Sequence, residues 1–501
     1  MMKTVCASSY QNINENYESF SDVDSLPSPQ QSAPLTRIVG EEAKATNWAQ
    51  NQLSSPDQLL FPRNVGELQS AIRTALANNA GPVVFRGSMH SWSPITAQSK
   101  GTAINVSRMI EKPVVDAEAQ TATVSGAMLL KDVYEALDAK GLTLASKPTI
   151  LDVTAAGALA TGTHGASRTS GMLADQVVSV KMVDGQGRLI KVNEEGSYEL
   201  NSDGTLGLQI MSGPGPLKAM KLHRGVLGAV VEVTFACVPA FDLEFVQAPQ
   251  DQAEAFGPGY EGIQRFLNEN EHGDFFWFVP DEKLLMRKAN RTDLPRKPRN
   301  PIAALILDDL IRSRLLTLTM KLLHTFPSLG RAVGWIGAHT FFGETIIRDR
   351  SDKVSSYLPG HASSESEFQA MEYGVPYGRC AEALAIVERE TKDFSMPIPM
   401  YFRRVGEKLY FEFLWLRNYP NGEETAKRLE AALIDAFGAG AMPHEGKLYF
   451  QNPWNRVPDA DKENFMAMKE EMDPNGIFLN QYMKKYFEGQ SDLTDSTGTN
   501  P

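Results

Sequence analysis

The sequence has little cysteine and a deficit of positive charge. Its three cysteines, Cys6, Cys237 and Cys380, lie far apart in a chain of 501 residues and in no paired spacing. Such a set predicts neither a disulfide framework nor a zinc site, and a reducing compartment is the expectation. Forty-nine lysines and arginines stand against 61 acidic residues, a net charge of −12. This balance repels a phosphate backbone, so we expect no nucleic-acid partner.

Long apolar runs are missing as well. The most apolar region, 301–338, is interrupted by charged residues such as Asp308, Arg312 and Lys321, whereas a membrane span takes about 20 consecutive apolar residues. The N-terminus has no continuous apolar core, so it does not resemble a secretory signal. We therefore expect a soluble, cytoplasmic protein without membrane association. One alternative stays open, in which the amphipathic stretch 302–325 lies on a membrane surface as a peripheral contact instead of packing on the protein.

What is present is a globular composition, with 42% hydrophobic, 22% charged and 9% aromatic residues. The length suffices for two or three domains with sizeable cores. Residues 1–40 and 489–501 are polar and are predicted to be poorly ordered ends.

Between residues 45 and 240, helical periodicity alternates with β-branched runs. Leu68, Ile72 and Leu76 recur every four residues and predict an amphipathic helix. A second helix is predicted around Val133 and Leu137. Strands are predicted at 83–85, 102–106, 121–125, 176–184, 188–192 and 229–238. The pattern indicates an α+β module of about 200 residues.

After Pro239 the pattern changes. A second region is predicted to hold a strand at 273–279, paired strands near 398–405 and 408–416, and helices at 302–325, 377–392 and 424–437. A last ordered piece covers 444–487.

Two loops rich in small residues contain histidines. The first, residues 86–94, follows a predicted strand and contains His90; the second, residues 155–167, contains His164. Eleven of the thirteen residues in the second loop are Gly, Ala, Ser or Thr. Small side chains leave backbone N–H groups open to a pyrophosphate or a flat ring, although such a run also serves as a tight packing contact. The chain has no G-x-G-x-x-G after its first strand and no H-E-x-x-H, G-x-S-x-G or Walker motif, so it has no Rossmann dinucleotide site of the usual kind and no metal is expected.

The order of several short motifs resembles a known family, the flavin-dependent oxidases of the vanillyl-alcohol-oxidase type, in the branch of sugar-1,4-lactone and alditol oxidases. The landmarks, in order along residues 45–487, are Asn47–Asn51 (NWAQN), Gly87–Ser91, Gly141–Gly165, Gly225–Phe241, Glu372–Pro376 (EYGVP), Pro443–Lys447 (PHEGK) and Asp473–Tyr482. Each motif alone is weak, whereas seven in the right order are specific.

The resemblance implies a fold and a domain order. It implies an α+β, two-domain flavoprotein of the FAD-binding PCMH type with an antiparallel-sheet substrate (cap) domain. The boundaries expected on this basis are an extension over 1–40, the FAD-binding domain over 41–240, the cap domain over 241–440, a C-terminal segment over 441–488 that returns to the FAD domain, and a tail over 489–501.

The same resemblance implies FAD as the cofactor. His90 matches a histidine that many members join covalently to the flavin, and the glycine that precedes it in the family is Met89 here. Ala166 and Ser167 follow the second histidine where doubly linked relatives have a cysteine, so a second attachment is not expected. The residues implied along the FAD are Gly87, Ser88, Ser91, Thr161, Gly162, Thr163, His164, Gly165, Gly228 and Val230.

The implied catalytic residues lie in the second half of the chain. Lys447 and Arg403 correspond to cations that stabilise reduced flavin, and His444 is either a substrate contact or a structural residue. The family usually has Glu-x-Arg on a strand that faces the flavin, but Tyr401 occupies the glutamate position here and is expected to help position the substrate hydroxyl. Either the substrate differs from the usual polyol or lactone, or a carboxylate comes from elsewhere, with Glu445 as the first candidate.

The implied activity is oxidation of a CH–OH group of a sugar lactone, alditol or related alcohol by hydride transfer to flavin N5. O2 is the expected acceptor, as in D-arabinono-1,4-lactone oxidase. Two alternatives stay open: a flavin dehydrogenase that passes electrons to a quinone or cytochrome, and a flavoprotein that tailors a bulky metabolite or sterol.

Overall fold

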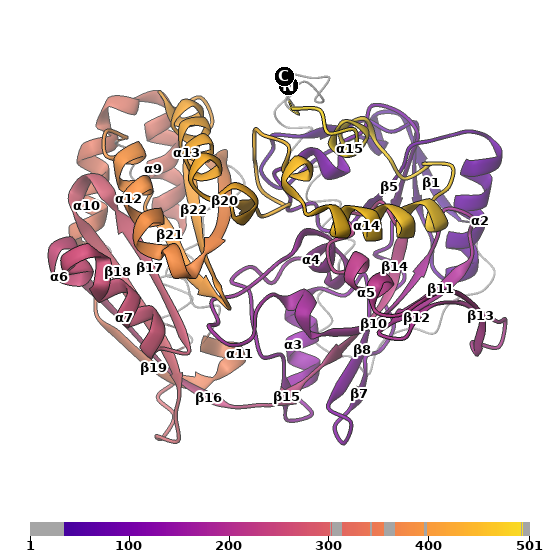
Figure 1. The fold of residues 1–501 in the computed structure, drawn as a ribbon, viewed down its shortest axis with the longest axis horizontal. Helices are drawn as coiled ribbons and strands as arrows, with labels where there is room; N and C mark the ends of the chain where they lie inside the picture. The colour runs from indigo at the N-terminus through magenta and orange to yellow at the C-terminus, as the bar shows by residue number, and fades with distance from the viewer. Residues whose placement is uncertain are drawn as a thin grey trace.

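The chain forms two bodies that face each other in the computed structural model (Figure 1). The structure describes residues 35–300, 302, 313–340, 343–354, 366–394, 398–491 and 493. Most of the expected extension and tail lies outside these ranges. The extension was predicted to reach residue 40, but Thr36–Val39 forms strand β1, paired with Gln58–Phe61 of β4. Polar composition concealed this edge strand, in which Ile38 packs under the sheet.

The first body begins with a small mixed sheet and a helix. The sheet has the order β1-β4-β6-β5. Its remaining strands are β6 (Thr102–Asn105) and β5 (Val83–Arg86). Helix α2 (Val65–Ala77) confirms the predicted amphipathic helix; the Asn64 side chain caps it, and Leu68 and Ile72 are fully buried. The short strands β2 (Ala45–Thr46) and β3 (Leu53–Ser54) pair beside this sheet.

A seven-stranded antiparallel sheet forms the rest of the first body, in the order β13-β12-β11-β10-β14-β8-β7. In chain order its strands are β7 (Val114–Asp116), β8 (Thr121–Ser125), β10 (Val177–Val183), β11 (Leu189–Asn193), β12 (Gly196–Leu200), β13 (Leu206–Ser212) and β14 (Ala229–Ala236). The helices of this part are α3 (Leu130–Asp138), α4 (Ala155–Thr161) and α5 (Gly215–Met220). Strands β9 (Leu142–Thr143) and β15 (Val238–Pro239) form a separate pair. The strands predicted for this sheet are therefore confirmed within one or two residues.

The second body is an eight-stranded antiparallel sheet with helices. Its order is β19-β16-β18-β17-β21-β22-β20-β23. The strands are β16 (Asp242–Asp251), β17 (His272–Phe278), β18 (Lys283–Arg291), β19 (Thr345–Arg350), β20 (Phe368–Pro376), β21 (Met400–Val405), β22 (Lys408–Leu416) and β23 (Met442–Pro443). The helices are α6 (Gln252–Phe256), α7 (Glu261–Glu269), α9 (Ser313–Thr325), α10 (Gly330–Thr340), α11 (Ser351–Val354), α12 (Cys380–Thr391) and α13 (Gly422–Phe437).

Alternation along the central strands of this sheet separates a core face from a face turned to the first body. Phe275, Phe402 and Phe411 are fully buried, and the rings of Phe275 and Phe402 stack 4.7 Å apart. Because successive side chains of a strand point to opposite faces, their neighbours Phe276 and Tyr401 face the other way. That second face carries the candidate site.

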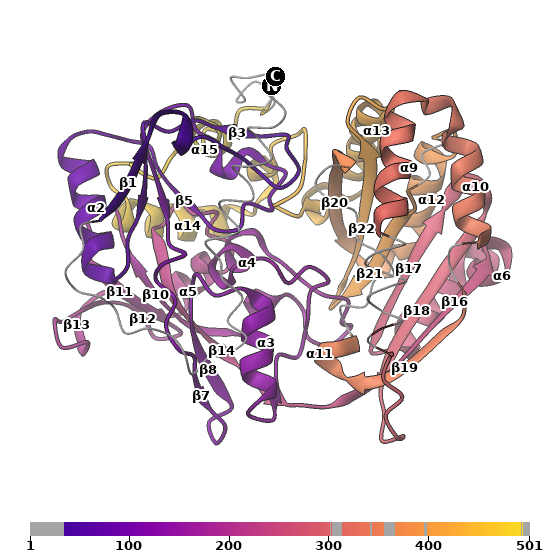
Figure 2. The same cartoon turned by 180° about the vertical axis from the view of Figure 1, so that it is seen from behind.

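The C-terminal segment returns to the first body (Figures 1 and 2). Helices α14 (Asp459–Met472) and α15 (Gln481–Phe487) pack there. The Val83 N–H donates to the Ile477 carbonyl at 2.7 Å, and the Asn480 amide donates to the carbonyls of Pro94, Ile95 and Ala97. The last part of the chain thus supports the strand that leads into the first histidine loop. Among the described helices, none combines the length and the apolar character that crossing a membrane requires.

Candidate active site

A cavity of about 1010 Å³ lies between the two bodies. Both histidine loops line it on the side of the first body, and the second face of the large sheet lines it on the other. Of the residues predicted along the cofactor, most line this cavity: Gly87, Ser88, His90, Ser91, Thr161, Thr163, His164, Gly228 and Val230. Gly162 and Gly165 are not among its lining residues.

The first loop holds His90 in an apolar, aromatic setting. The His90 ring stacks on Trp48, with ring centroids 5.4 Å apart and planes 19° from parallel. Burial lowers the pKa of His90 to about 4, against a smaller opposing effect of Asp152. Met89 has a φ of 53°, in the left-handed region that favours glycine. The glycine that the family has before this histidine therefore suits the left-handed backbone conformation at this position. Met89 adopts the same conformation with strain.

The second loop is fixed by close backbone contacts. Thr154 caps α4 by accepting from the Gly157 N–H, and Gly162 ends the helix with a φ of 73°. A Cβ atom on Gly165 would lie 2.3 Å from the Lys147 carbonyl oxygen. Gly162 and Gly165 thus shape the loop, while the residues between them turn into the cavity.

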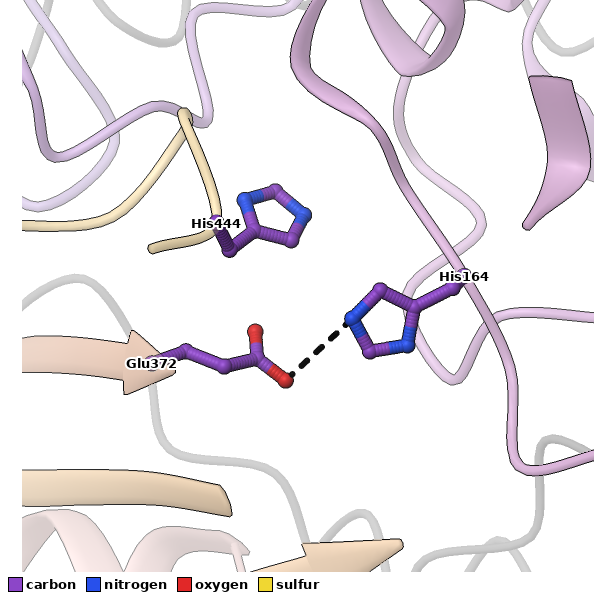
Figure 3. Close-up of side chains that lie close together, drawn as sticks. All are labelled: His164, Glu372 and His444. Carbon is purple, nitrogen blue, oxygen red and sulfur yellow. Dashed lines mark ion pairs between the residues drawn. The ribbon is translucent and has the colours of Figure 1, made fainter. Parts of the chain in front are cut away.

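Three cavity-lining side chains from distant parts of the chain lie close together: His164 from the second loop, Glu372 from β20 and His444 from the C-terminal segment (Figure 3). His164 Nε2 lies 3.5 Å from Glu372 Oε1. The backbone N–H of His444 donates to the Glu372 carbonyl at 2.9 Å, which ties the C-terminal segment to β20.

Charges around the cluster fix its protonation. Burial by itself raises the pKa of Glu372, but the positive charge of Arg403, whose Nη2 lies 2.5 Å from Glu372 Oε1, outweighs it and holds that pKa well below the usual range. Burial, reinforced by Arg403, lowers the pKa of His164 to about 3. Burial also lowers the pKa of His444. At neutral pH the cluster is therefore a carboxylate between two neutral imidazoles.

The tautomer of His164 leaves an acceptor without a donor. Its Nδ1 lies 3.1 Å from the Gly165 carbonyl oxygen, which can only accept, so Nδ1 carries the proton. Nε2 is then a lone pair facing the ionised Glu372, and neither Nε2 nor Glu372 Oε2 has a hydrogen-bond partner among the residues that the structure describes. Buried acceptors left in this state are costly. A ligand hydroxyl placed between them supplies the missing donor.

The same three residues also have the spacing of a metal-ligand set, since their candidate ligand atoms lie within 4.8 Å of one another. The neighbouring charge disfavours that use, because Arg403 already occupies Glu372 Oε1. A divalent cation would have to displace the guanidinium and then remain next to it. The arrangement fits a neutral hydroxyl better than a cation.

A row of residues on the large sheet continues the site. Register places Glu372 of β20 opposite Glu412 of β22, and Glu412 opposite Tyr401 of β21. Opposed residues share a face, so all three point into the cavity, which they line. Lys447 Nζ lies 2.5 Å from Glu412 Oε1 and 4.0 Å from the centre of the Trp92 ring.

The hydroxyl of Tyr401 is committed elsewhere. It donates to Asp274 Oδ2 at 3.1 Å, and Asp274 Oδ1 lies 2.9 Å from Nε of Arg287. Burial, together with the charge of Asp274, raises the pKa of Tyr401. Tyr401 lines the cavity as a neutral ring with its proton pointed away.

Glu445, the carboxylate we expected to replace the family's glutamate, is not brought to the cavity. Its Oε1 lies 2.5 Å from Nη2 of Arg224 and accepts from Tyr486 at 2.8 Å, and its Oε2 accepts from Tyr449 at 3.0 Å. It is 2% exposed. Its neighbours His444 and Lys447 do line the cavity. Glu445 instead anchors the C-terminal segment to the loop that contains Arg224.

Sequence reasoning missed two site carboxylates. Glu372 lies in a recognised motif but had no assigned role. Glu412 lies in a strand rich in aromatic residues, whose sequence is typical of a buried strand. A charged residue within the run LYFEFLWL was the available signal, because a carboxylate in a buried strand needs a partner.

Comparisons with known proteins identify the family of the chain. Residues 56–193 match the family described as FAD binding domain, and residues 233–486, just over half of the chain, match the family described as D-arabinono-1,4-lactone oxidase. L-gulonolactone oxidase of Bos taurus is 26% identical over 467 residues, which cover 89% of this chain and 98% of that protein. L-gulono-1,4-lactone dehydrogenase of Mycobacterium tuberculosis is 25% identical over 455 residues, which cover 88% and 98%.

A solved structure shares the fold. Cholesterol oxidase from B. sterolicum superposes with a TM-score of 0.71 at 15% identity, over 92% of this chain and 99% of that chain. At that identity the likeness concerns the fold. Together with the sheets described above, it confirms the expected α+β fold of the FAD-binding PCMH type with an antiparallel-sheet second domain.

Proposed function

The chain belongs to the D-arabinono-1,4-lactone oxidase family, and on that premise we propose that it is an FAD-dependent oxidoreductase that oxidises a CH–OH group of a small lactone or alcohol. One observation carries the proposal: the two small-residue histidine loops meet the Glu372–Arg403 pair in a single cavity. FAD is the two-electron acceptor that this chemistry needs, and it takes the hydride when bound.

The residues present fit that cofactor. Much of the wall formed by the two loops is made of small side chains such as Gly87, Ser88 and Thr161, which suits a pyrophosphate and a flat ring, and larger side chains such as His90 and Trp92 line it beside them. At Gly228, φ is 148°, and a Cβ atom would lie 2.5 Å from the Val183 carbonyl oxygen, so the backbone comes to the cavity edge without a side chain. Arg403 and Lys447 also line the cavity and would supply two cations to a bound flavin. Positive charge there stabilises the anionic reduced cofactor.

The substrate hydroxyl is held by the acceptors that lack a donor. His164 Nε2 and Glu372 Oε2 point into the same space, so a hydroxyl between them donates its proton to one of these two atoms. Moving that proton as the hydride leaves carbon turns the C–O bond into a carbonyl. Neutral His164 is the base, since its Nε2 lone pair faces the hydroxyl and ionised Glu372 partly offsets the burial and the Arg403 charge that lower its pKa.

His90 is the residue that attaches the cofactor. With its pKa lowered to about 4, the buried imidazole is neutral and keeps a nucleophilic ring nitrogen at physiological pH. The stack on Trp48 fixes the ring plane. A covalent link through this nitrogen withdraws electrons from the flavin and raises its potential, which favours hydride uptake from an unactivated alcohol.

A direct test is reduction of the bound flavin. The purified protein, loaded with FAD, is mixed without oxygen with D-arabinono-1,4-lactone, L-gulono-1,4-lactone or alditols while the visible flavin band is followed. Bleaching supports the proposal, and a protein that takes up no FAD overturns it. Admitting air then separates an oxidase, which forms H2O2, from a dehydrogenase that needs a quinone or cytochrome.

A pair of variants assigns the site. Glu372→Gln removes the charge that supports His164, and we expect bleaching about 100-fold slower. The matched control is Glu407→Gln, which lies in the β21–β22 turn with its side chain 91% exposed. Equal loss in both variants would contradict the assignment.

A further inference from the structure

The cavity has an apolar arm beyond the charged cluster. On β17, Phe278 follows Phe276 at a spacing of two, and on β22, Leu414 follows Glu412 in the same way. Each step of two residues stays on the cavity face. Strands β17 and β22 both run antiparallel to β21, which lies between them, so the two steps move in the same direction. The face that carries Glu372 and Glu412 at one level is therefore apolar at the next, while Arg403 lies at the level on the opposite side.

Helices α9 and α10 close this arm from the other side. Leu316 and Met320 of α9 and Val333 and Ile336 of α10 line the same cavity as the charged cluster. Within the described part of these helices, no charged side chain lines it. The arm is thus a pocket with an apolar wall on each side and its polar end at the Glu372 cluster.

Such an apolar wall does not favour the binding of a sugar lactone. Each of its hydroxyl groups would lose water there without finding a partner, at a cost that binding must offset. An alkyl or ring group, in contrast, gains free energy for each part of its surface that leaves water. The wall and the cluster belong to one continuous space, so one molecule can reach both.

We propose that the substrate is amphiphilic, with a CH–OH head at the Glu372 cluster and an apolar group in the arm formed by Phe276, Phe278, Leu414 and helices α9 and α10. This inference rests on the proposed function, which it narrows to a substrate class. The hydroxyl head meets the acceptors, and the apolar group sets specificity.

The test uses 1,2-alkanediols of increasing length, from 1,2-propanediol to 1,2-decanediol. These compounds keep the same hydroxyl head while the alkyl tail becomes longer. Their binding to the FAD-loaded protein is measured by calorimetry, and flavin bleaching is followed in parallel. Affinity is expected to rise about fourfold for each added methylene until the chain outgrows the arm. Affinity that does not change with length overturns the inference.

A variant that fills the arm tests whether the alkyl tail binds there. Among the described residues, a Cβ atom at Gly337 of α10 would meet only the Phe278 ring, at 4.0 Å, so Gly337→Leu fills the arm while improving helix propensity. We expect Gly337→Leu to remove the gain for long diols and to leave the shortest diol unaffected. The matched control is Leu318→Gln on α9, a residue that is 64% exposed and does not line the cavity. Loss of the length dependence in Leu318→Gln instead would assign it to the outer surface and contradict the proposal.

The two proposals fail in different ways. A yellow protein that unsubstituted lactones bleach, with no dependence on diol length, overturns the arm and keeps the oxidoreductase. A protein that binds long diols but takes up no FAD overturns the oxidoreductase and, with it, the assignment of the diol as a substrate.

Discussion

Glu412 on β22 lies directly opposite Tyr401 on β21, and its carboxylate contacts Lys447. The family pattern puts a carboxylate at the position of Tyr401. In this chain a carboxylate of the same sheet face stands one strand away, with a cation beside it. In this chain the site therefore has its carboxylate on β22 and not at the family's position on β21.

Glu412→Gln is expected to lower kcat/KM about 100-fold, because Lys447 loses its partner and the hydroxyl end of the cavity loses a charge. Tyr401→Phe is expected to cost less than about fivefold, since the phenol proton is given to Asp274 and not to the cavity. Steady-state kinetics with a lactone or alcohol that bleaches the flavin provide the measurement. A larger loss in Tyr401→Phe than in Glu412→Gln would reverse the roles assigned to the two residues.

Covalent attachment predicts a simple difference in colour. Acid-precipitated wild-type protein should retain flavin in the pellet, whereas His90→Ala should release it to the supernatant. Flavin fluorescence of the denatured protein after electrophoresis measures both. Flavin that stays bound in His90→Ala would place the link elsewhere, and flavin released by the wild type would show that it is not covalent.

Stability should fall as the pH falls from 6.5 toward 4. Burial lowers the pKa of His164 to about 3 and that of His223 to about 4. An unfolded histidine titrates near pH 6.5, so below that pH the unfolded chain binds more protons than the folded one. Each of these histidines should cost about 2 kcal/mol of unfolding free energy at pH 5 relative to pH 7.5.

The unfolding temperature of the FAD-loaded protein between pH 8 and pH 5 checks this dependence. His223→Gln removes one of the titrating groups, and its curve should be flatter than that of the wild type. A variant that follows the wild-type slope would show that the imidazole of His223 does not carry the effect.

Breaking the buried pair of Arg224 and Glu445 should destabilise the fold. Glu445→Leu leaves an unpaired guanidinium in the interior, and we expect a loss of about 3–5 kcal/mol in unfolding free energy. Replacing both partners, with Arg224→Met added, should restore part of that loss because no buried charge remains. Denaturant unfolding of the two single variants and the double variant closes the cycle. Strict additivity would mean that the two side chains do not stabilise each other.

Much of the fold follows from local patterns. Periodicity located α2 and α13, and β-branched runs located β10 and β14, because each pattern reflects a single element with one buried face. Strand β1 escaped detection because its four residues, with only Ile38 packed beneath the sheet, give no period of their own.

The site was less predictable because it depends on register and on direction. Nothing local to Glu412 states that it stands opposite Tyr401, since that relation is set by the pairing of two whole strands. In the same way, His444 and Glu445 are adjacent in sequence, but only the first lines the cavity, because the chain turns here, with the Lys447 N–H donating to the His444 carbonyl. Motif order identified the right segments without saying which side chain turns inward.

The position of the C-terminal segment has a consequence for how the protein matures. His444, Lys447 and Phe478 all line the cavity, and the carbonyl of Ile477 holds the start of β5. While residues 444–478 are still to be synthesised, the nascent chain therefore lacks one wall of the pocket, although the loops that contain His90 and His164 already exist. The pocket is incomplete until residue 478 is in place, and any truncation before that residue should yield an apoprotein rather than a weakened holoenzyme.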